Sequence, residues 1–122
     1  MTAKVWIVDD DSSIRWVLER TLGSEGFECE SFADGEALLS SLEMRSPDVI
    51  LSDIRMPGID GLAFFRRIEA FDADLPVILV TGHGDIPMAV QALQDGVYDF
   101  IPKPFAADRL VQSVHRALEK RR

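Results

Sequence analysis

The sequence predicts a doubly wound α/β fold, in which helices cover both faces of a five-stranded parallel sheet. Five short apolar runs alternate with segments of helical periodicity along 122 residues, a length that suits one hydrophobic core. Most of these runs are continuously apolar, as strands buried on both faces of a parallel sheet are. Ligands of such sheets bind at the edge where the strands end, so that edge is where function is expected.

The predicted strands follow the apolar runs. They cover residues 4–8, 27–32, 48–52, 76–80 and 98–101. The second run differs from the others, because apolar and polar residues alternate from Phe27 to Phe32. Alternation is typical of a strand with one exposed face. We therefore expect this strand at an edge of the sheet.

Helix signals separate the strands. Short polar side chains accept hydrogen bonds from the free N–H groups of a first helical turn. The predicted capping residues are Ser12 or Ser13, Asp34 and Asp60. The first helix should run to about Leu22, and the last should begin at about Ala107. Pro87 suits the first turn of the fourth helix, where its missing N–H costs nothing.

Composition excludes several classes of protein. Apolar residues make up 47% of the chain and charged residues 28%, an ordinary globular mixture. No apolar run approaches the ~20 residues that span a bilayer. Membrane insertion is therefore not expected. The formal net charge of -8 disfavours contact with a phosphate backbone, so nucleic-acid binding is not expected either. The single Cys29 fits a reducing compartment, which indicates a cytoplasmic domain.

Polar residues follow the predicted strands. Residues 9–11 are three consecutive aspartates, Asp53 follows the third strand, Thr81 the fourth and Lys103 the fifth. Parallel strands end at one edge, so these side chains should converge there. Several carboxylates in one crevice raise one another's pKa unless a cation is bound. Carboxylate oxygens suit Mg²⁺. Helix capping would explain one such aspartate but not four.

Four motifs occur at these strand ends. They are Val8-Asp9-Asp10, the segment DIRMPGIDG at 53–61, Thr81-Gly82 and Lys103-Pro104-Phe105. Together they resemble the receiver domains of bacterial two-component response regulators, over essentially the whole chain. Within that family the sequence is most similar to the NtrC and DctD subfamily of transcriptional activators. The resemblance implies the flavodoxin/CheY-like strand order 2-1-3-4-5. It also implies that residues 1–122 are one receiver domain at the N-terminal part of a longer regulator.

The resemblance implies a phosphoryl-transfer site. Asp53 would be the nucleophile that accepts a phosphoryl group from a sensor histidine kinase. The implied Mg²⁺ ligands are Asp9, Asp10, Asp53 and the main-chain carbonyl of Arg55. Lys103 would neutralise charge on the transferred group, and Thr81 would donate its hydroxyl to it. The role of Asp11 stays open, and the Arg55 side chain is expected to point to water.

The resemblance also implies an output face, formed by the fourth helix, the fifth strand and the fifth helix. Thr81 and Phe100 would be the switch residues, although Phe100 equally fits a core position. A helical-wheel count leaves Met88 and Ala92 exposed. The residues assigned to the buried face are Ile86, Ala89, Val90 and Leu93. Expected partners are a second copy of the chain and, in the full-length protein, a σ54-activator ATPase and a DNA-binding domain.

Other functions fit these residues less well. A phosphohydrolase of the haloacid dehalogenase type needs a second aspartate two places after its nucleophile, where this chain has Arg55. A flavin or nucleotide binder on the same scaffold should carry a glycine-rich phosphate loop, and none occurs. A docking module that works without phosphorylation remains an alternative. We therefore expect a regulatory domain and not a turnover enzyme.

Overall fold

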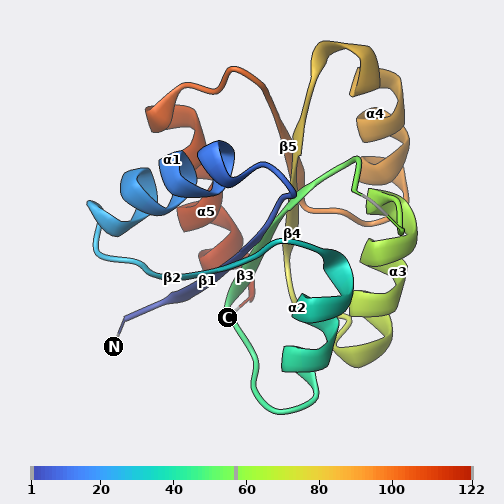
Figure 1. Cartoon of the computed structure of the whole chain (residues 1–122), viewed down its shortest axis with the longest axis horizontal. Helices are drawn as coiled ribbons and strands as arrows, with labels where there is room; N and C mark the ends of the chain where they lie inside the picture. The colour runs from blue at the N-terminus through green and yellow to red at the C-terminus, as the bar shows by residue number, and fades with distance from the viewer. Residues whose placement is uncertain (1, 57, 122) are drawn as a thin grey trace.

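The computed structural model describes residues 2–56 and 58–121, and its sheet confirms the predicted fold (Figure 1). Five parallel strands lie in the order β2-β1-β3-β4-β5. Their bounds are β1 Lys4–Val8, β2 Glu28–Phe32, β3 Val49–Asp53, β4 Val77–Thr81 and β5 Asp99–Pro102. The last three strands begin and end one residue later than predicted. Pairing of Asp53 with Val80 and of Thr81 with Pro102 extends their carboxyl ends.

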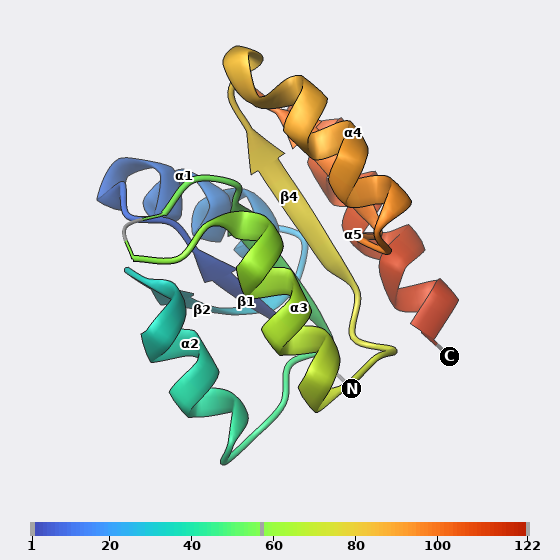
Figure 2. The same cartoon turned by 90° about the vertical axis from the view of Figure 1, so that its right-hand side faces the viewer.

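Helices cover both faces of the sheet. Their bounds are α1 Ser12–Gly23, α2 Gly35–Leu42, α3 Gly61–Phe71, α4 Ile86–Gln94 and α5 Ala107–Arg121, with a 3₁₀ turn, η1, at His83–Asp85. The helices α1 and α5 lie on one side of the sheet, and α2, α3 and α4 cross the other side in that order (Figures 1 and 2). No helix of the described residues is long and apolar enough to cross a membrane.

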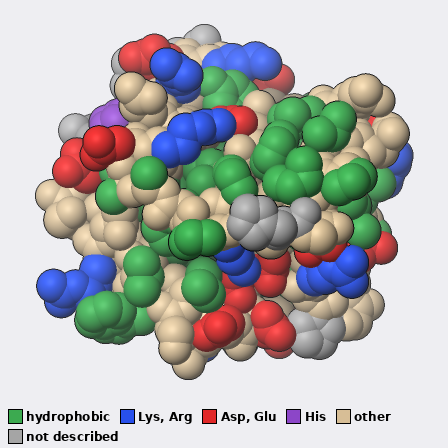
Figure 3. Space-filling model, turned by 90° about the horizontal axis from the view of Figure 1, so that it is seen from above, with side chains coloured by type: hydrophobic (Ala, Val, Ile, Leu, Met, Phe, Trp, Pro, Cys, Tyr) green, Lys and Arg blue, Asp and Glu red, His purple; other side chains and the backbone are tan. Residues whose placement is uncertain are grey.

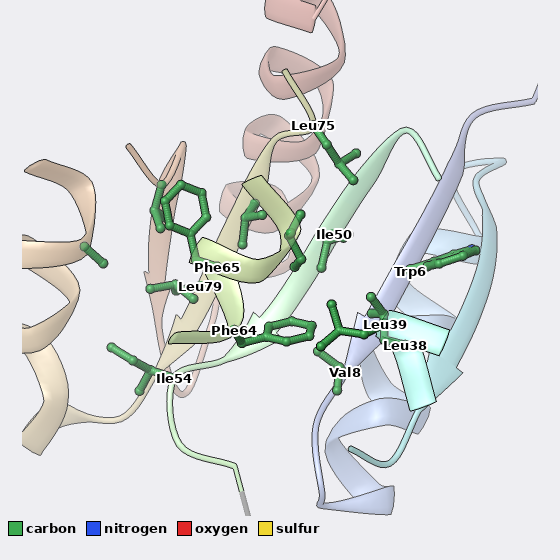
Figure 4. Close-up of a cluster of buried hydrophobic side chains, with 14 of the residues drawn as sticks. Trp6, Val8, Leu38, Leu39, Ile50, Ile54, Phe64, Phe65, Leu75 and Leu79 are labelled. Carbon is green, nitrogen blue, oxygen red and sulfur yellow. The ribbon is translucent and has the colours of Figure 1, made fainter. Parts of the chain in front are cut away.

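Alternation of side chains along β1 divides the core into two layers. Successive strand residues point to opposite faces. Trp6 and Val8 therefore pack under α2 and α3, whereas Val5 and Ile7 pack under α1 and α5. In Figure 4 the fully buried ring of Phe64 lies between the sheet and α2. Burial on both faces explains why the strand sequences are continuously apolar.

The edge position of β2 confirms the interpretation of its alternating sequence. Arg45 forms a bidentate ion pair with Glu30 on β2, and its guanidinium lies 5.1 Å from the centroid of the Trp6 ring. The lone Cys29 is half-buried among the side chains under α1 and α5. Burial, and secondarily the charge of Glu19, raise the pKa of this thiol to about 11. It is therefore a packing residue that stays protonated at neutral pH.

The predicted cap of α1 is wrong, whereas those of α2 and α3 are confirmed. Asp34 and Asp60 accept hydrogen bonds from the N–H groups of Ala37 and Ala63. At α1, however, Asp11 is the N-cap, and its carboxylate accepts from the Ser13 N–H over 2.8 Å. The helix begins one residue earlier than expected because Asp11 has the extended backbone that a cap requires. This position gives Asp11 a structural role.

We expect Asp11→Ala to lower the free energy of unfolding by about 1 kcal/mol, since the Ser13 N–H loses its acceptor. Ser12→Ala should change it by less than about 0.5 kcal/mol, because Ser12 is an exposed residue inside the helix. Urea denaturation of both variants measures the difference. If Ser12→Ala were the more destabilising change, the cap would belong to the serine after all.

The wheel-based orientation of α4 is also corrected. Ala92 is 1% exposed, so its side chain contributes nothing to an output face, whereas Val90 is 44% exposed and Met88 is 38% exposed. Most residues of α4 are apolar, so periodicity alone does not define its buried side. The small side chains of Ala89 and Ala92 let the helix approach the sheet closely, and Val90 turns outward. The exposed large apolar side chains of α4 are therefore Met88 and Val90.

Candidate metal centre

Three carboxylates meet where β1 and β3 end. Asp9 and Asp10 follow β1, Asp53 ends β3, and these two strands are neighbours in the sheet. One carboxylate oxygen from each residue lies within 4.8 Å of the others. Asp9 is buried, Asp53 is half-buried and Asp10 is exposed. The convergence predicted from the strand ends is therefore present, and Asp11 lies outside the cluster.

Lys103 brings a cation to this cluster from the loop after β5. Its Nζ atom lies 3.3 Å from Asp9 Oδ2 and 3.6 Å from Asp53 Oδ1. The Lys103 N–H donates to the Thr81 carbonyl over 2.7 Å, which holds the loop against the end of β4. The following peptide bond, Lys103–Pro104, is cis. One ammonium group thus faces two of the three carboxylates.

Asp9 is held in place by its neighbours on the chain. Its Oδ1 atom accepts from the Asp11 N–H over 2.9 Å, and its main-chain carbonyl accepts from Arg15 Nη1 over 2.6 Å. Arg15 therefore ties the start of α1 to the cluster. In the sequence, the only indication of this contact is that Arg15 lies in the first helical turn after the aspartates.

The charges of the cluster favour the binding of a further cation. Burial, and then the charge of Asp9, raise the pKa of the Asp53 carboxyl above its ordinary value, and Asp10 acts in the same direction. Lys103 and the Arg55 N–H lower that pKa without cancelling the rise. A divalent cation would offset the repulsion, and three carboxylate oxygens this close are donors that Mg²⁺ accepts. The residues present therefore fit a Mg²⁺ ion.

This raised pKa predicts that Asp53 destabilises the metal-free fold at neutral pH. A carboxyl with a higher pKa in the folded state binds its proton better there. Its unfavourable contribution therefore grows as the pH rises from the ordinary pKa of 3.8 through the raised value. In a chelator, Asp53→Asn should melt at a higher temperature than the parent at neutral pH, and the difference should shrink toward acidic pH. Equal melting temperatures at all pH values would contradict the electrostatic account.

Arg55 contacts the cluster through its main chain. Its N–H donates to Asp53 Oδ1 over 3.3 Å. The Arg55 side chain was expected only to point to water. Its Nε atom instead donates a hydrogen bond to Asp85 Oδ1 over 2.6 Å. Asp85 belongs to η1 and was not identified from the sequence. Only the fold brings the two residues together, 30 positions apart.

Seen from the edge where the strands end, acidic side chains lie beside a group of hydrophobic ones (Figure 3).

The sequence matches the family model of the response regulator receiver domain over residues 5–115. The chain belongs to this family. It is a receiver domain with its own hydrophobic core.

Known receivers are similar to the chain in both sequence and structure. It is 61% identical over 118 residues to the C4-dicarboxylate transport transcriptional regulatory protein DctD of Rhizobium meliloti, covering 97% of this chain and 26% of that protein. It is 53% identical over 114 residues to the DNA-binding transcriptional regulator NtrC of Salmonella typhimurium, covering 93% and 24%. The chain thus spans about a quarter of the length of these curated relatives.

Solved structures agree with the fold. The crystal structure of NtrX from Brucella abortus in complex with ADP superposes with a TM-score of 0.94 at 40% identity, covering 99% of this chain and 28% of that one. The solution structure of the apo receiver domain of nitrogen regulatory protein C superposes with a TM-score of 0.87 at 51% identity, covering 96% and 94%.

The two predicted switch residues, Thr81 and Phe100, lie on β4 and β5. Thr81 ends β4 and is fully buried, and its hydroxyl donates to the Gly82 carbonyl over 3.2 Å. Phe100 is half-buried and packs against the core under α2, α3 and α4. The switch roles of Thr81 and Phe100 stay predictions, as do the individual roles of the metal and phosphoryl-transfer residues.

Proposed function

We propose that Asp53 accepts a phosphoryl group from a histidine of a sensor kinase. The observation that carries this proposal is the meeting of Asp9, Asp10 and Asp53 with the ammonium of Lys103. Mg²⁺ would be held by these three carboxylates and by the main-chain carbonyl of Arg55. When bound, it supplies a positive charge for the oxygens of the transferring group.

Asp53, Lys103 and Thr81 have different roles in the proposed phosphoryl transfer. An Asp53 carboxylate oxygen attacks phosphorus, a new O–P bond forms, and the bond from phosphorus to the donor nitrogen breaks. The donor histidine keeps the electron pair of that bond. Lys103 neutralises charge on the transferred oxygens, and the Thr81 hydroxyl turns from the Gly82 carbonyl to donate to one of them. The product is an aspartyl phosphate.

Incubation of the chain with Mg²⁺ and acetyl phosphate tests the proposal. Intact mass should show one labile phosphoryl group, which peptide mapping after reductive trapping places on Asp53. A chelator should prevent its formation. A stable adduct on another residue, or none at all, would refute the proposal. Binding to a kinase without any adduct would favour the docking-module alternative instead.

We propose an output through the face of α4, β5 and α5. The aspartyl phosphate would carry about -1.5 to -2 charges in place of the single charge of the carboxylate, beside the buried end of β4, and the movement of Thr81 and Phe100 toward it would reshape this face. The exposed Met88 and Val90 then offer an apolar contact for a second copy of the chain. In a cytoplasmic full-length regulator of the DctD or NtrC type, this step would control σ54-activator ATPase and DNA-binding domains.

Met88→Asp should weaken phosphorylation-dependent self-association about tenfold, because it places a charge in the centre of the proposed contact. Labelling of Asp53 should remain unchanged. Gln94→Asp is the matched control, since it adds the same charge at another exposed position of α4. Analytical ultracentrifugation in the presence of acetyl phosphate measures the effect. Equal association of both variants would exclude Met88 from the contact.

A further inference from the structure

An ion pair joins the segment after β3 to the start of α4. Arg55 Nε lies 2.6 Å from Asp85 Oδ1. The Asp85 side chain is 12% exposed, whereas that of Arg55 is 70% exposed. Asp85 is thus the anchored partner, and it restrains a segment that otherwise lies at the surface.

The restrained segment is in direct contact with Asp53. The Arg55 N–H donates to Asp53 Oδ1, so the peptide that carries the Arg55 side chain also orients the reacting carboxylate. A displacement of Arg55 would therefore change the position of an oxygen of the acidic cluster. Asp85 is connected to that oxygen through a single residue.

Asp85 occupies the N-cap position of α4 without capping it. Three other aspartates at N-cap positions have extended backbones and accept an N–H of their own helix: Asp11, Asp34 and Asp60. Asp85 has φ -108° and ψ 7° and makes no such bond. Because Pro87 has no N–H, Met88 carries the N–H that a side-chain cap would use. The Asp85 carboxylate has two alternative partners, and here it binds Arg55.

We propose that Asp85 is a positioning residue for the reaction at Asp53, which holds the main chain of Arg55 beside the acidic cluster and leaves α4 without its side-chain cap while it does so. The proposal rests on the proposed function, in which Mg²⁺ binds at that cluster. The Asp85 side chain makes the Arg55 pair and no cap bond, and we propose that the pair and the cap are alternative positions of that side chain. A ligand that favours the Arg55 pair must therefore disfavour the cap, by the reciprocity of linked equilibria.

Magnesium affinity separates positioning from simple electrostatics. If charge alone acts, Arg55→Ala removes a cation near the site and strengthens Mg²⁺ binding. If Arg55 is positioned by Asp85, Arg55→Ala weakens Mg²⁺ binding about threefold, the effect of losing one ordered contact. Asp85→Ala should also weaken Mg²⁺ binding. The Mg²⁺ affinity of the double variant should be no lower than that of whichever single variant binds Mg²⁺ more weakly. Calorimetric titration of the metal-free chain with MgCl₂ measures all three.

A control removes an ion pair of the same length elsewhere. Arg67 and Glu36 form a 2.6 Å pair between two elements, α3 and α2, in which both side chains are exposed. Arg67→Ala should leave Mg²⁺ affinity unchanged. Thermal denaturation verifies that every variant is folded. Tighter Mg²⁺ binding by Arg55→Ala, or additive losses in the double variant, would overturn the positioning role.

Amide exchange without metal tests the second half of the proposal. Arg55→Ala frees Asp85 to accept the Met88 N–H, so exchange of that amide should slow about fivefold, the usual effect of a side-chain cap. The double variant with Asp85→Ala should show no slowing. An unchanged Met88 amide in Arg55→Ala would refute the cap exchange. Failure of the parent chain to bind Mg²⁺ would refute the proposed function, whereas this measurement would still decide whether Asp85 exchanges Arg55 for the cap of α4.

Discussion

Asp53→Asn should abolish the covalent uptake of a phosphoryl group from acetyl phosphate, with a loss of about a thousandfold or more in rate. A carboxamide is a poor nucleophile and cannot form an acyl phosphate. The variant should keep its fold, since asparagine has the shape of aspartate and its oxygen can still accept the Arg55 N–H. The time course of intact mass in the presence of Mg²⁺ measures the rate.

Asp11→Asn provides the matched control for this substitution. It removes one negative charge from the same edge of the sheet, but Asp11 lies outside the carboxylate cluster. Asparagine caps helices as well as aspartate does, so α1 should remain intact. The control should take up the phosphoryl group at a rate close to that of the parent chain. Labelling of Asp53→Asn at the parent rate would place the acceptor at another residue.

Gly61→Ala should destabilise the fold strongly, by about 3 kcal/mol. A Cβ atom at Gly61 would lie 2.8 Å from both the Cα and the carbonyl oxygen of Ile54. These are main-chain atoms, so no side chain can rotate away from the clash. The Gly61 N–H also donates to that same Ile54 carbonyl over 2.8 Å, and this bond must break or lengthen. Urea denaturation measures the loss of stability.

The same substitution should impair the acidic cluster, since Ile54 directly follows Asp53 and a shift of its main chain moves the end of β3. We expect weaker Mg²⁺ binding by the fraction of Gly61→Ala that remains folded. Gly23→Ala is the control, because a Cβ atom at Gly23 in the last turn of α1 has nothing within 4 Å. Parent-like stability of Gly61→Ala would show that α3 can move away from the Ile54 segment at little cost.

The strands and the location of the site could be predicted because they depend on properties that the sequence carries directly. Continuous apolar runs report burial on both faces, and the alternation from Phe27 to Phe32 reports an edge. Parallel strands end at one edge, so residues as distant as Asp9 and Lys103 could be expected to meet, and they lie 3.3 Å apart. The caps at Asp34 and Asp60 depend only on bonds within a few residues.

Other features could not be predicted, because several residues satisfied the same local rule. Asp11, Ser12 and Ser13 can all cap a helix, and the choice follows from the backbone that leads out of β1. On α4 the apolar residues surround the helix, so the wheel assigned Val90 to the core and Ala92 to the surface, which is wrong.

The sequence by itself determined the parallel α/β fold, the edge position of β2 and the set of acids that gather at the carboxyl ends of the strands. Each of these follows from periodicity, or from a topological rule that holds for every parallel sheet. Only the tertiary structure decided which face of α4 is buried and that Asp85 binds Arg55 instead of capping its own helix. Both outcomes depend on the packing distance between segments far apart in the chain, and that distance is set by the side chains between them.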